Sequence, residues 1–178
     1  MKLSSERSLV EMKPVLLNKA ASGDGAVYWV FSRLGGKWEN LTIISSNKYG
    51  DEYAKTFGHY HGAEVPEKYH VASGQGVVVL QTRNQDQVFA IKMQTGDEIV
   101  ITPEWGHAFV NVGTDPLMLF DDWRSGHTSH DYEQIGKMAG MSVYVVGDNV
   151  EHRLVPNPKY NLKSKPKWVS LADFTQSR

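Results

Sequence analysis

The sequence predicts an all-β fold, and three observations indicate this class. Between residues 26 and 155, short segments rich in Val, Ile, Tyr, Phe and Trp alternate with Gly, Asn and Asp. Their spacing is typical of a sandwich or barrel. Helical signals are confined to 131–138, which follows Ser129-His130 and stops near Gly140. With 178 residues, we expect a single domain over 1–178, with a barrel core at about 26–155.

The predicted elements are separated by turn-forming residues. Turn chemistry marks Ser73–Gly76, Thr95–Asp97 and Gly113–Pro116 as connections between strands. The first 25 residues and the stretch after Pro156 are expected to be peripheral arms, ordered only if they pack on the barrel or on a second subunit. In chain order, the predicted strands are Val27–Phe31, Trp38–Ser45, His59–His61, Lys68–Ala72, Val77–Gln81, Val88–Lys92, Glu98–Ile101, His107–Asn111, Met118–Asp122 and Ser142–Val146.

Composition excludes several classes of function. Nineteen Lys and Arg against 20 Asp and Glu leave a formal charge of −1, which disfavours nucleic acid and anionic membranes as partners. The chain has no cysteine, so thiolate metal sites, iron–sulfur clusters and a Cys nucleophile are ruled out. No apolar run is long enough for a signal peptide core or a membrane span, and we therefore expect a cytoplasmic protein.

A group of histidines with one glutamate predicts a metal site. His59 and His61 face the same side if their segment is extended. A lone His-x-His is a weak signal, but here Glu67 follows, and a second block from Gly96 through a short proline loop ends in His107. Three imidazoles and a carboxylate form a shell suited to Fe, Mn, Ni, Co or Zn.

The two blocks have the form of the two cupin motifs, and the chain resembles the cupin-type phosphoglucose isomerases of archaea and some bacteria. The resemblance covers about Leu41 to Gly140. It implies a double-stranded β-helix (jelly-roll) barrel with one short helix. The residues that carry it are Thr42, Thr56-Phe57-Gly58-His59-Tyr60-His61, Glu67-Lys68-Tyr69, Leu80-Gln81, Gly96-Asp97, Trp105-Gly106-His107, Asn111-Val112-Gly113, Pro116, and His130-Asp131-Tyr132 with Ile135.

The resemblance implies a homodimer that binds a divalent metal, most often Fe(2+), and interconverts glucose 6-phosphate and fructose 6-phosphate in glycolysis and gluconeogenesis. The implied metal ligands are His59, His61, Glu67 and His107. The implied substrate-binding residues are Thr42, Thr56, Gly58, Tyr69, His130 and Tyr132. The chain departs from the family at Trp123, where the family has a tyrosine, and in extra residues at 124–129.

Two mechanisms and two other functions stay open. Glu67 either moves a proton between C1 and C2 as the catalytic base, or is only a ligand while hydride shifts directly. The same ligand shell also suits an iron dioxygenase, and a cupin can bind sugar without turnover. A phosphate pocket favours the isomerase.

The remaining histidines and two tryptophans have simpler explanations. His70, His127 and His152 are expected to be solvated or hydrogen-bonded rather than ligands. Tyr60 is expected to face away from the cavity by strand alternation. For Trp105 and Trp123, a cavity wall and core packing are equally compatible with the sequence.

Overall fold

The structure is a computed structural model that describes residues 1–61, 65–124, 128–148 and 150–176. Fourteen strands and a few short helices make up these residues, so the predicted all-β class is confirmed. The strands are β1 (Lys2–Ser8), β2 (Ala26–Ser32), β3 (Asn40–Ile44), β4 (Lys48–Tyr49), β5 (Glu52–Tyr53), β6 (Glu67–Ser73), β7 (Gln75–Thr82), β8 (Val88–Gln94), β9 (Glu98–Ile101), β10 (Trp105–Asn111), β11 (Leu117–Asp121), β12 (Val143–Gly147), β13 (His152–Pro156) and β14 (Lys167–Val169). The helices are α1 (Leu9–Met12), a 3-10 turn (Lys13–Val15), α2 (Ser129–Lys137) and α3 (Leu171–Gln176).

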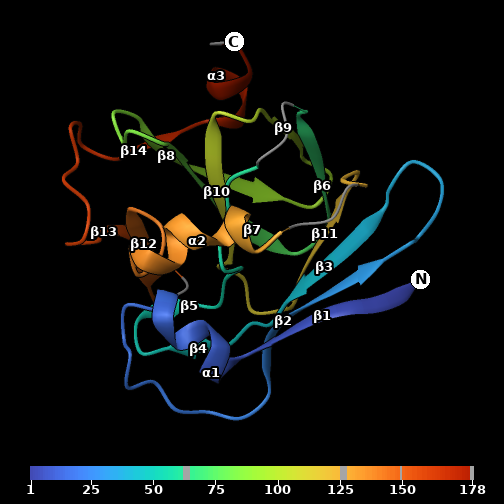
Figure 1. The fold of residues 1–178 in the computed structure, drawn as a ribbon, viewed down its shortest axis with the longest axis horizontal. Helices are drawn as coiled ribbons and strands as arrows, with labels where there is room; N and C mark the ends of the chain where they lie inside the picture. The colour runs from blue at the N-terminus through green and yellow to red at the C-terminus, as the bar shows by residue number, and fades with distance from the viewer. Residues whose placement is uncertain (62–64, 125–127, 149, 177–178) are drawn as a thin grey trace.

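The strands form three sheets. One has six strands in the order β1-β2-β3-β11-β6-β9, the second has the order β10-β7-β8-β14, and the third has the order β13-β12-β5-β4. In Figure 1 the six-stranded sheet lies to one side of β10 and β7, and α2 lies near the centre of the view. The first two sheets carry four of the residues predicted to bind metal or substrate: Thr42 on β3, Glu67 and Tyr69 on β6, and His107 on β10.

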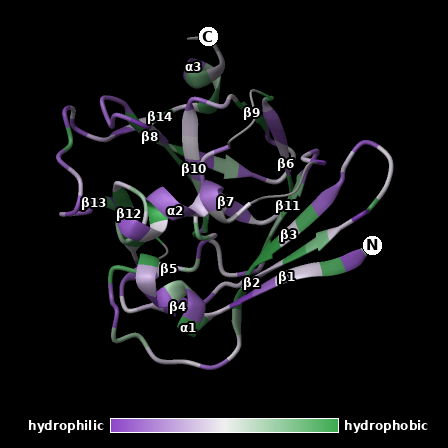
Figure 2. Cartoon of the chain, in the orientation of Figure 1, coloured by the Kyte–Doolittle hydropathy of each residue, from purple (hydrophilic) through white to green (hydrophobic). Residues whose placement is uncertain are grey.

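Alternation along the strands places the core between the sheets. In β6, Glu67, Tyr69 and Val71 are buried while the residues between them are half-exposed. All seven residues of β10 are buried, because this strand packs on both faces. Figure 2 shows hydrophobic residues along β2 and β12, whereas much of α2 is hydrophilic.

Both terminal arms pack on the sheets. In the N-terminal arm, β1 pairs antiparallel with β2, with Arg7 opposite Tyr28. In the C-terminal arm, β14 pairs parallel with β8, and the Phe174 ring packs 5.6 Å from that of Trp105. The arms are therefore ordered by contact with the rest of the chain, one of the two ways predicted.

A buried ion pair fastens the N-terminal arm. Lys55 contacts the carboxylate of Glu52, and both side chains are almost fully buried. The Lys55 ammonium also donates to the Val15 carbonyl at 2.8 Å, and the second Glu52 oxygen accepts from the Leu17 N–H at 2.6 Å. Because each charge has a backbone partner from the arm, the pair ties residues 15–17 to the third sheet.

One predicted strand is not regular. Residues 59–61 belong to none of the sheets, and His59 alone makes an isolated bridge, opposite His107. The reason is a loop conformation at Gly58, whose φ is +83°. Within the described residues, no helix is long and apolar enough to cross a membrane.

Candidate metal centre and substrate cavity

The four predicted metal ligands lie together. His59, His61, Glu67 and His107 each offer one ligand atom, and these atoms lie within 4.8 Å of one another. All four side chains are buried, with exposed fractions between 0 and 7%. The sequence prediction therefore located four residues from three separate segments that the fold brings to one point.

Backbone pairing fixes this arrangement. The His59 N–H donates to the His107 carbonyl at 3.1 Å, and the His107 N–H donates back to the His59 carbonyl at 2.9 Å. Gly58 makes the approach possible, since a Cβ there would lie 3.0 Å from Met141 Sδ and 3.3 Å from the Ala108 methyl. The φ of +83° adds strain for any other residue.

Alternation between 59 and 61 holds locally despite the irregular backbone. The His59 and His61 rings lie 4.8 Å apart, edge to face. Tyr60 points away from the histidines, and its hydroxyl accepts from the Gln81 side-chain amide at 2.8 Å. The prediction for Tyr60 is confirmed.

Hydrogen bonding sets the charge of the group. Burial alone would raise the pKa of Glu67, but hydrogen bonds and charge from His107 and His61 outweigh it and lower the pKa to about 2. Glu67 Oε2 lies 2.7 Å from His61 Nε2 and 3.5 Å from His107 Nε2. Burial lowers the pKa of His107, and Glu67 opposes this shift. A carboxylate beside a neutral imidazole is the ionisation state that metal binding requires.

The donor set fits a divalent transition metal. Glu67 Oε1 is buried and makes no hydrogen bond to any described residue, so it keeps an acceptor for a cation. Three imidazoles and a carboxylate suit Fe, Mn, Ni, Co or Zn, and no soft thiolate is present to favour a different choice. A metal held here would contact the ring nitrogens of His59, His61 and His107 and the carboxylate of Glu67.

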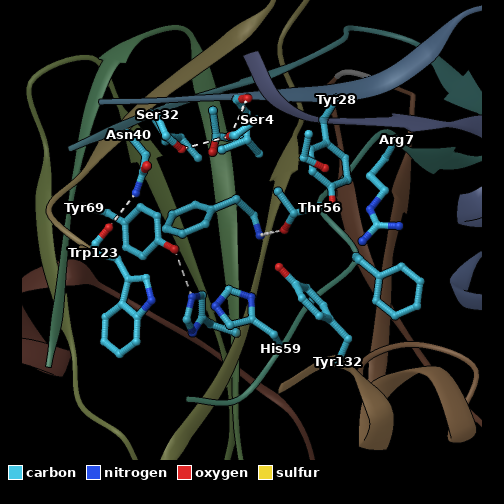
Figure 3. Close-up of a pocket in the computed structure, with 18 residues that line it drawn as sticks. Ser4, Arg7, Tyr28, Ser32, Asn40, Thr56, His59, Tyr69, Trp123 and Tyr132 are labelled. Carbon is cyan, nitrogen blue, oxygen red and sulfur yellow. Dashed lines mark hydrogen bonds between the residues drawn. The ribbon is translucent and has the colours of Figure 1, made fainter. Parts of the chain in front are cut away.

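A cavity of about 340 Å³ opens beside this group (Figure 3). This volume lies in the range of small-molecule sites. His59 and His107 form part of its wall, so a ligand in the cavity reaches the metal-ligand candidates. The other residues of the wall are Ser4, Ser5, Arg7, Tyr28, Val30, Ser32, Asn40, Thr42, Thr56, Phe57, Gly58, Tyr69, Phe109, Leu119, Trp123 and Tyr132.

Five of the six predicted substrate-binding residues line the cavity: Thr42, Thr56, Gly58, Tyr69 and Tyr132. Thr56 Oγ1 accepts from the Phe109 N–H at 3.0 Å, which leaves its own proton to donate. The Tyr69 hydroxyl lies 3.2 Å from His107 Nε2. Burial, together with the charge of Glu67, raises the pKa of Tyr69 well above its usual value, so this hydroxyl stays protonated.

His130 is the sixth, and the structure places it outside the cavity wall. Its side chain is 86% exposed, and Nδ1 lies 3.5 Å from the Glu133 carboxylate. Both His130 and Tyr132 belong to α2, and residues two apart on a helix point about 200° apart. Since Tyr132 faces the cavity, His130 faces solvent.

Helix α2 is held against the metal-ligand segment. The Tyr60 N–H donates to the Asp131 carbonyl at 3.0 Å, and the Thr128 N–H donates to the Asp131 carboxylate at 2.7 Å. The Tyr132 ring therefore lies 5.5 Å from that of His59. Burial raises the pKa of Tyr132, so its hydroxyl remains a hydrogen-bond donor at neutral pH.

Sequence reasoning missed the contribution of the N-terminal arm. Arg7 on β1 and Tyr28 on β2 line the cavity, although residues 1–25 were expected to be peripheral. Asn40 also lines it and donates to Asp121 Oδ1 at 2.6 Å. Burial and the charge of Glu67 raise the pKa of Asp121 to about 8. Residues 2–8 are polar apart from Leu3, so no alternation of polar and apolar residues indicated a strand there.

The other histidines and tryptophans are also placed. His70 is half-exposed and stacks on Trp38 at 5.7 Å, and His152 Nδ1 lies 3.2 Å from the Tyr53 hydroxyl. Both belong to hydrogen-bonding or stacking contacts away from the metal-ligand group. The prediction for His127 lies outside the described residues. Of the two alternatives for the tryptophans, Trp123 lines the cavity and Trp105 packs on Phe89.

Comparisons with known proteins found a matching family model and several relatives. A family model described as glucose-6-phosphate isomerase (GPI) matches residues 36–161. A glucose-6-phosphate isomerase of Thermococcus litoralis is 30% identical over 170 residues, 89% of this chain and 88% of the relative. That of Thermococcus gammatolerans is 32% identical over 68% of this chain, and the match covers 63% of the relative's length, less than two thirds. The Drosophila melanogaster CENP-C cupin domain is similar at 16% identity and a TM-score of 0.42, over 56% of this chain and 70% of that chain.

Proposed function

Because the chain belongs to the cupin-type glucose-6-phosphate isomerase family, we propose that it is a metal-dependent aldose–ketose isomerase that interconverts glucose 6-phosphate and fructose 6-phosphate. The observation that carries the proposal is the group of His59, His61, Glu67 and His107, two of which, His59 and His107, line a cavity of a size suited to a sugar phosphate. The hydroxyls of the cavity wall suit a polyhydroxylated substrate, since each can donate or accept.

The reaction moves a proton between C1 and C2 of the open-chain sugar while charge shifts between the two oxygens. A bound divalent cation supplies Lewis-acid stabilisation of that charge. We assign Fe(2+) as the native metal, with Mn, Ni, Co and Zn as alternatives for the same donors. The protonated hydroxyls of Tyr69 and Tyr132 orient the sugar by hydrogen bonds.

Glu67 is the proposed catalytic base. A carboxylate bound to a metal is a poorer base than a free one, so Glu67 must loosen from the metal as the sugar oxygens enter, and it then takes the proton from one carbon and returns it to the neighbouring carbon. The side chain is fully buried and lies behind the cavity wall, so the carboxylate must turn toward the sugar. A direct hydride shift needs no such movement, and the two mechanisms differ in whether solvent hydrogen enters the product.

The phosphate group of the substrate is expected at Thr42, Thr56 and the backbone N–H of Gly58. Hydroxyls and main-chain N–H groups bind phosphate oxygens without a basic patch on the surface, which agrees with the neutral composition. His130 was assigned to the phosphate from the resemblance. With its ring exposed in this structure, it can reach the substrate only after a rearrangement of α2.

The setting of the reaction is part of the same proposal. We assign the protein to glycolysis and gluconeogenesis in the cytoplasm, acting as a homodimer. Analytical ultracentrifugation at micromolar concentration tests the dimer, for which we expect a species of twice the 20.0 kDa chain mass. Sedimentation as a monomer at all concentrations would remove this part of the proposal.

The decisive experiment is a coupled assay of fructose 6-phosphate conversion. The protein is stripped with a chelator and then reconstituted separately with Fe(2+), Mn, Ni, Co and Zn. We expect no turnover in the stripped protein and turnover with at least one metal. No turnover with any of the five metals contradicts the isomerase. Oxygen consumption under the same conditions would indicate the iron dioxygenase, and sugar binding without turnover or oxygen use would indicate a non-catalytic cupin.

Glu67→Gln separates the two mechanisms. The amide keeps a ligand oxygen but cannot accept the proton, so turnover is expected to fall by about 100-fold or more while metal, measured by mass spectrometry, is retained. Glu133→Gln, at an exposed position of α2, is the matched control. In the native protein, deuterium from solvent should enter the product. Full turnover in Glu67→Gln, with no deuterium in product after a single turnover, would assign the reaction to hydride shift.

A further inference from the structure

Arg7 enters the cavity from the first strand of the chain. It lies on β1 opposite Tyr28 of β2, and the register of the two strands shifts directly after it, between Arg7 and Ser8. Its side chain is about one-third exposed, at 32%. Among the described residues of the cavity wall, Arg7 is the one lysine or arginine. The cavity therefore has a permanent positive charge that composition did not reveal.

Aromatic rings hold the guanidinium in place. Its central carbon lies 5.8 Å from the centre of the Tyr132 ring and 6.0 Å from that of Phe57. These two rings pack edge to face at 5.9 Å. The charge of Arg7 also opposes the rise in the pKa of Tyr28 that burial causes, which places the guanidinium beside a second hydroxyl. Arg7, Tyr28 and Tyr132 thus form one polar group, here called the Arg7 end of the cavity.

The N–H donors of the guanidinium are only partly used by the described residues. Nη1 makes a 3.5 Å contact with Glu11 Oε1 at the surface, an i,i+4 pair of a kind that contributes little. Nε is buried and makes no hydrogen bond to any described residue. A buried charged donor without an acceptor is costly, and the cost is recovered when an anion binds. None of the described residues of the cavity wall supplies a carboxylate to this donor.

We propose that Arg7 joins Thr42, Thr56 and the Gly58 N–H in binding the phosphate group of the sugar phosphate, a proposal that rests on the proposed function. In Figure 3, Arg7 lies on the side of the cavity away from Trp123 and Tyr69, with Tyr132 between them. A hexose phosphate has its phosphate at the end of the chain remote from C1 and C2. With C1 and C2 at the histidines, the phosphate then extends toward Arg7. The planar guanidinium matches a phosphate dianion in charge and geometry.

The test compares Arg7→Gln with Arg7→Lys and with Arg153→Gln, which removes an exposed arginine on β13 outside the cavity. In the metal-loaded protein, Arg7→Gln should raise the KM for fructose 6-phosphate about ten- to a hundredfold. The kcat should change less than about threefold. Arg7→Lys keeps the charge but not the fork of donors, so it should recover part of the affinity. Arg153→Gln should behave as the native protein.

A second measurement is independent of turnover. Binding of inorganic phosphate to the metal-free protein is measured by calorimetry, and the same tenfold or larger loss is expected in Arg7→Gln but not in Arg153→Gln. This result supports Arg7 as a phosphate ligand even if the native protein shows no isomerase activity, in which case the proposed function alone fails. The inference is overturned if folded Arg7→Gln binds phosphate as the native protein does, or if the native protein does not bind phosphate.

Discussion

The two ends of the cavity differ in where their residues come from and in how they are held. At the histidine end, His59, His61, Glu67 and His107 are buried, and two backbone hydrogen bonds join the segments that carry them. At the Arg7 end, the guanidinium comes from the first strand of the chain and is about one-third exposed. The histidine end is therefore part of the core, whereas the Arg7 end exists only when the N-terminal arm is docked.

This difference separates two tasks. Metal ligands need fixed spacing, because small displacements change coordination, and burial between paired segments provides it. A phosphate group at the far end of a flexible sugar needs charge and donors more than fixed geometry. Strand β1, at the edge of its sheet beside β2, is ordered enough to present Arg7 to a phosphate group. Changes at the first end should remove function outright, and changes at the second should weaken it by degrees.

The largest effect is expected at the histidine end. His107→Ala removes one of four donors, so metal affinity should fall by more than the 10- to 100-fold that loss of an outer-shell partner costs, and turnover should disappear with it. Metal content by mass spectrometry and titration with Ni(2+) measure the change. His70→Ala, on the opposite face of β6, is the matched control. Native metal affinity in His107→Ala would show that the four residues do not act as one site.

The sequence predicted the histidine end because its signal is local and chemically restrictive. His59, His61 and Glu67 fall within nine residues, and without cysteine few other donors are available. Nine of the ten predicted strands form, and the exception at 59–61 arises from the positive φ of Gly58. Alternation of faces correctly predicted that Tyr60 points away from the histidines, although its backbone is not a regular strand.

The Arg7 end could not be predicted in the same way. Its residues, Arg7, Tyr28 and Tyr132, are spread over 125 positions, and only the pairing of β1 with β2 brings the first two together. Charge in a polar terminal segment is ordinarily solvated, so sequence alone favoured an arm. The assignment of His130 came from the resemblance, and helical geometry turns that residue to solvent while Tyr132 faces inward. A local sequence pattern predicts which residues share one face of a strand. The pairing of strands that are distant in sequence decides which terminal segment lines the cavity.

An intermediate effect is expected from the anchor of the arm. Lys55→Met leaves the buried Glu52 carboxylate without its cation, so the free energy of unfolding should fall by about 3 to 5 kcal/mol. Urea denaturation measures it. Lys37→Met, which breaks an exposed pair with Glu98, should cost less than about 1 kcal/mol.

Lys55→Met also tests whether the two ends of the cavity are held by separate contacts. Lys55 binds the Val15 carbonyl, so its loss should loosen the arm and weaken binding of inorganic phosphate, while Ni(2+) binds the histidine end with unchanged affinity. Glu52→Gln combined with Lys55→Met removes the stranded charge and should recover stability. Equal losses of phosphate and Ni(2+) affinity would mean that the two ends are held by the same contacts.

The smallest effect is expected from Asp121, which holds two residues of the cavity wall, Asn40 and Trp123. Asp121 is buried, accepts from Asn40 of the cavity wall at 2.6 Å and from the Trp123 N–H at 3.1 Å, and has a pKa raised to about 8 by burial and by the charge of Glu67. The folded-state pKa lies above the unfolded value of about 3.9. Protonation of Asp121 therefore stabilises the folded protein. This stabilisation is fully present below the unfolded pKa and is lost as pH rises toward 8.

Asp121→Asn should remove the fall in stability with rising pH. The amide oxygen accepts both hydrogen bonds and does not ionise, so the stability of the variant, measured by urea denaturation with chelator present, should vary less with pH than that of the native protein. Each pH unit below the folded pKa corresponds to about 1.4 kcal/mol, so the native protein should lose about 2 kcal/mol at most between about pH 6.5 and about pH 8 relative to the variant. Parallel curves would mean that Asp121 is ionised in the folded protein. The carboxylate would then hold Asn40 and Trp123 of the cavity wall in position as a buried charge.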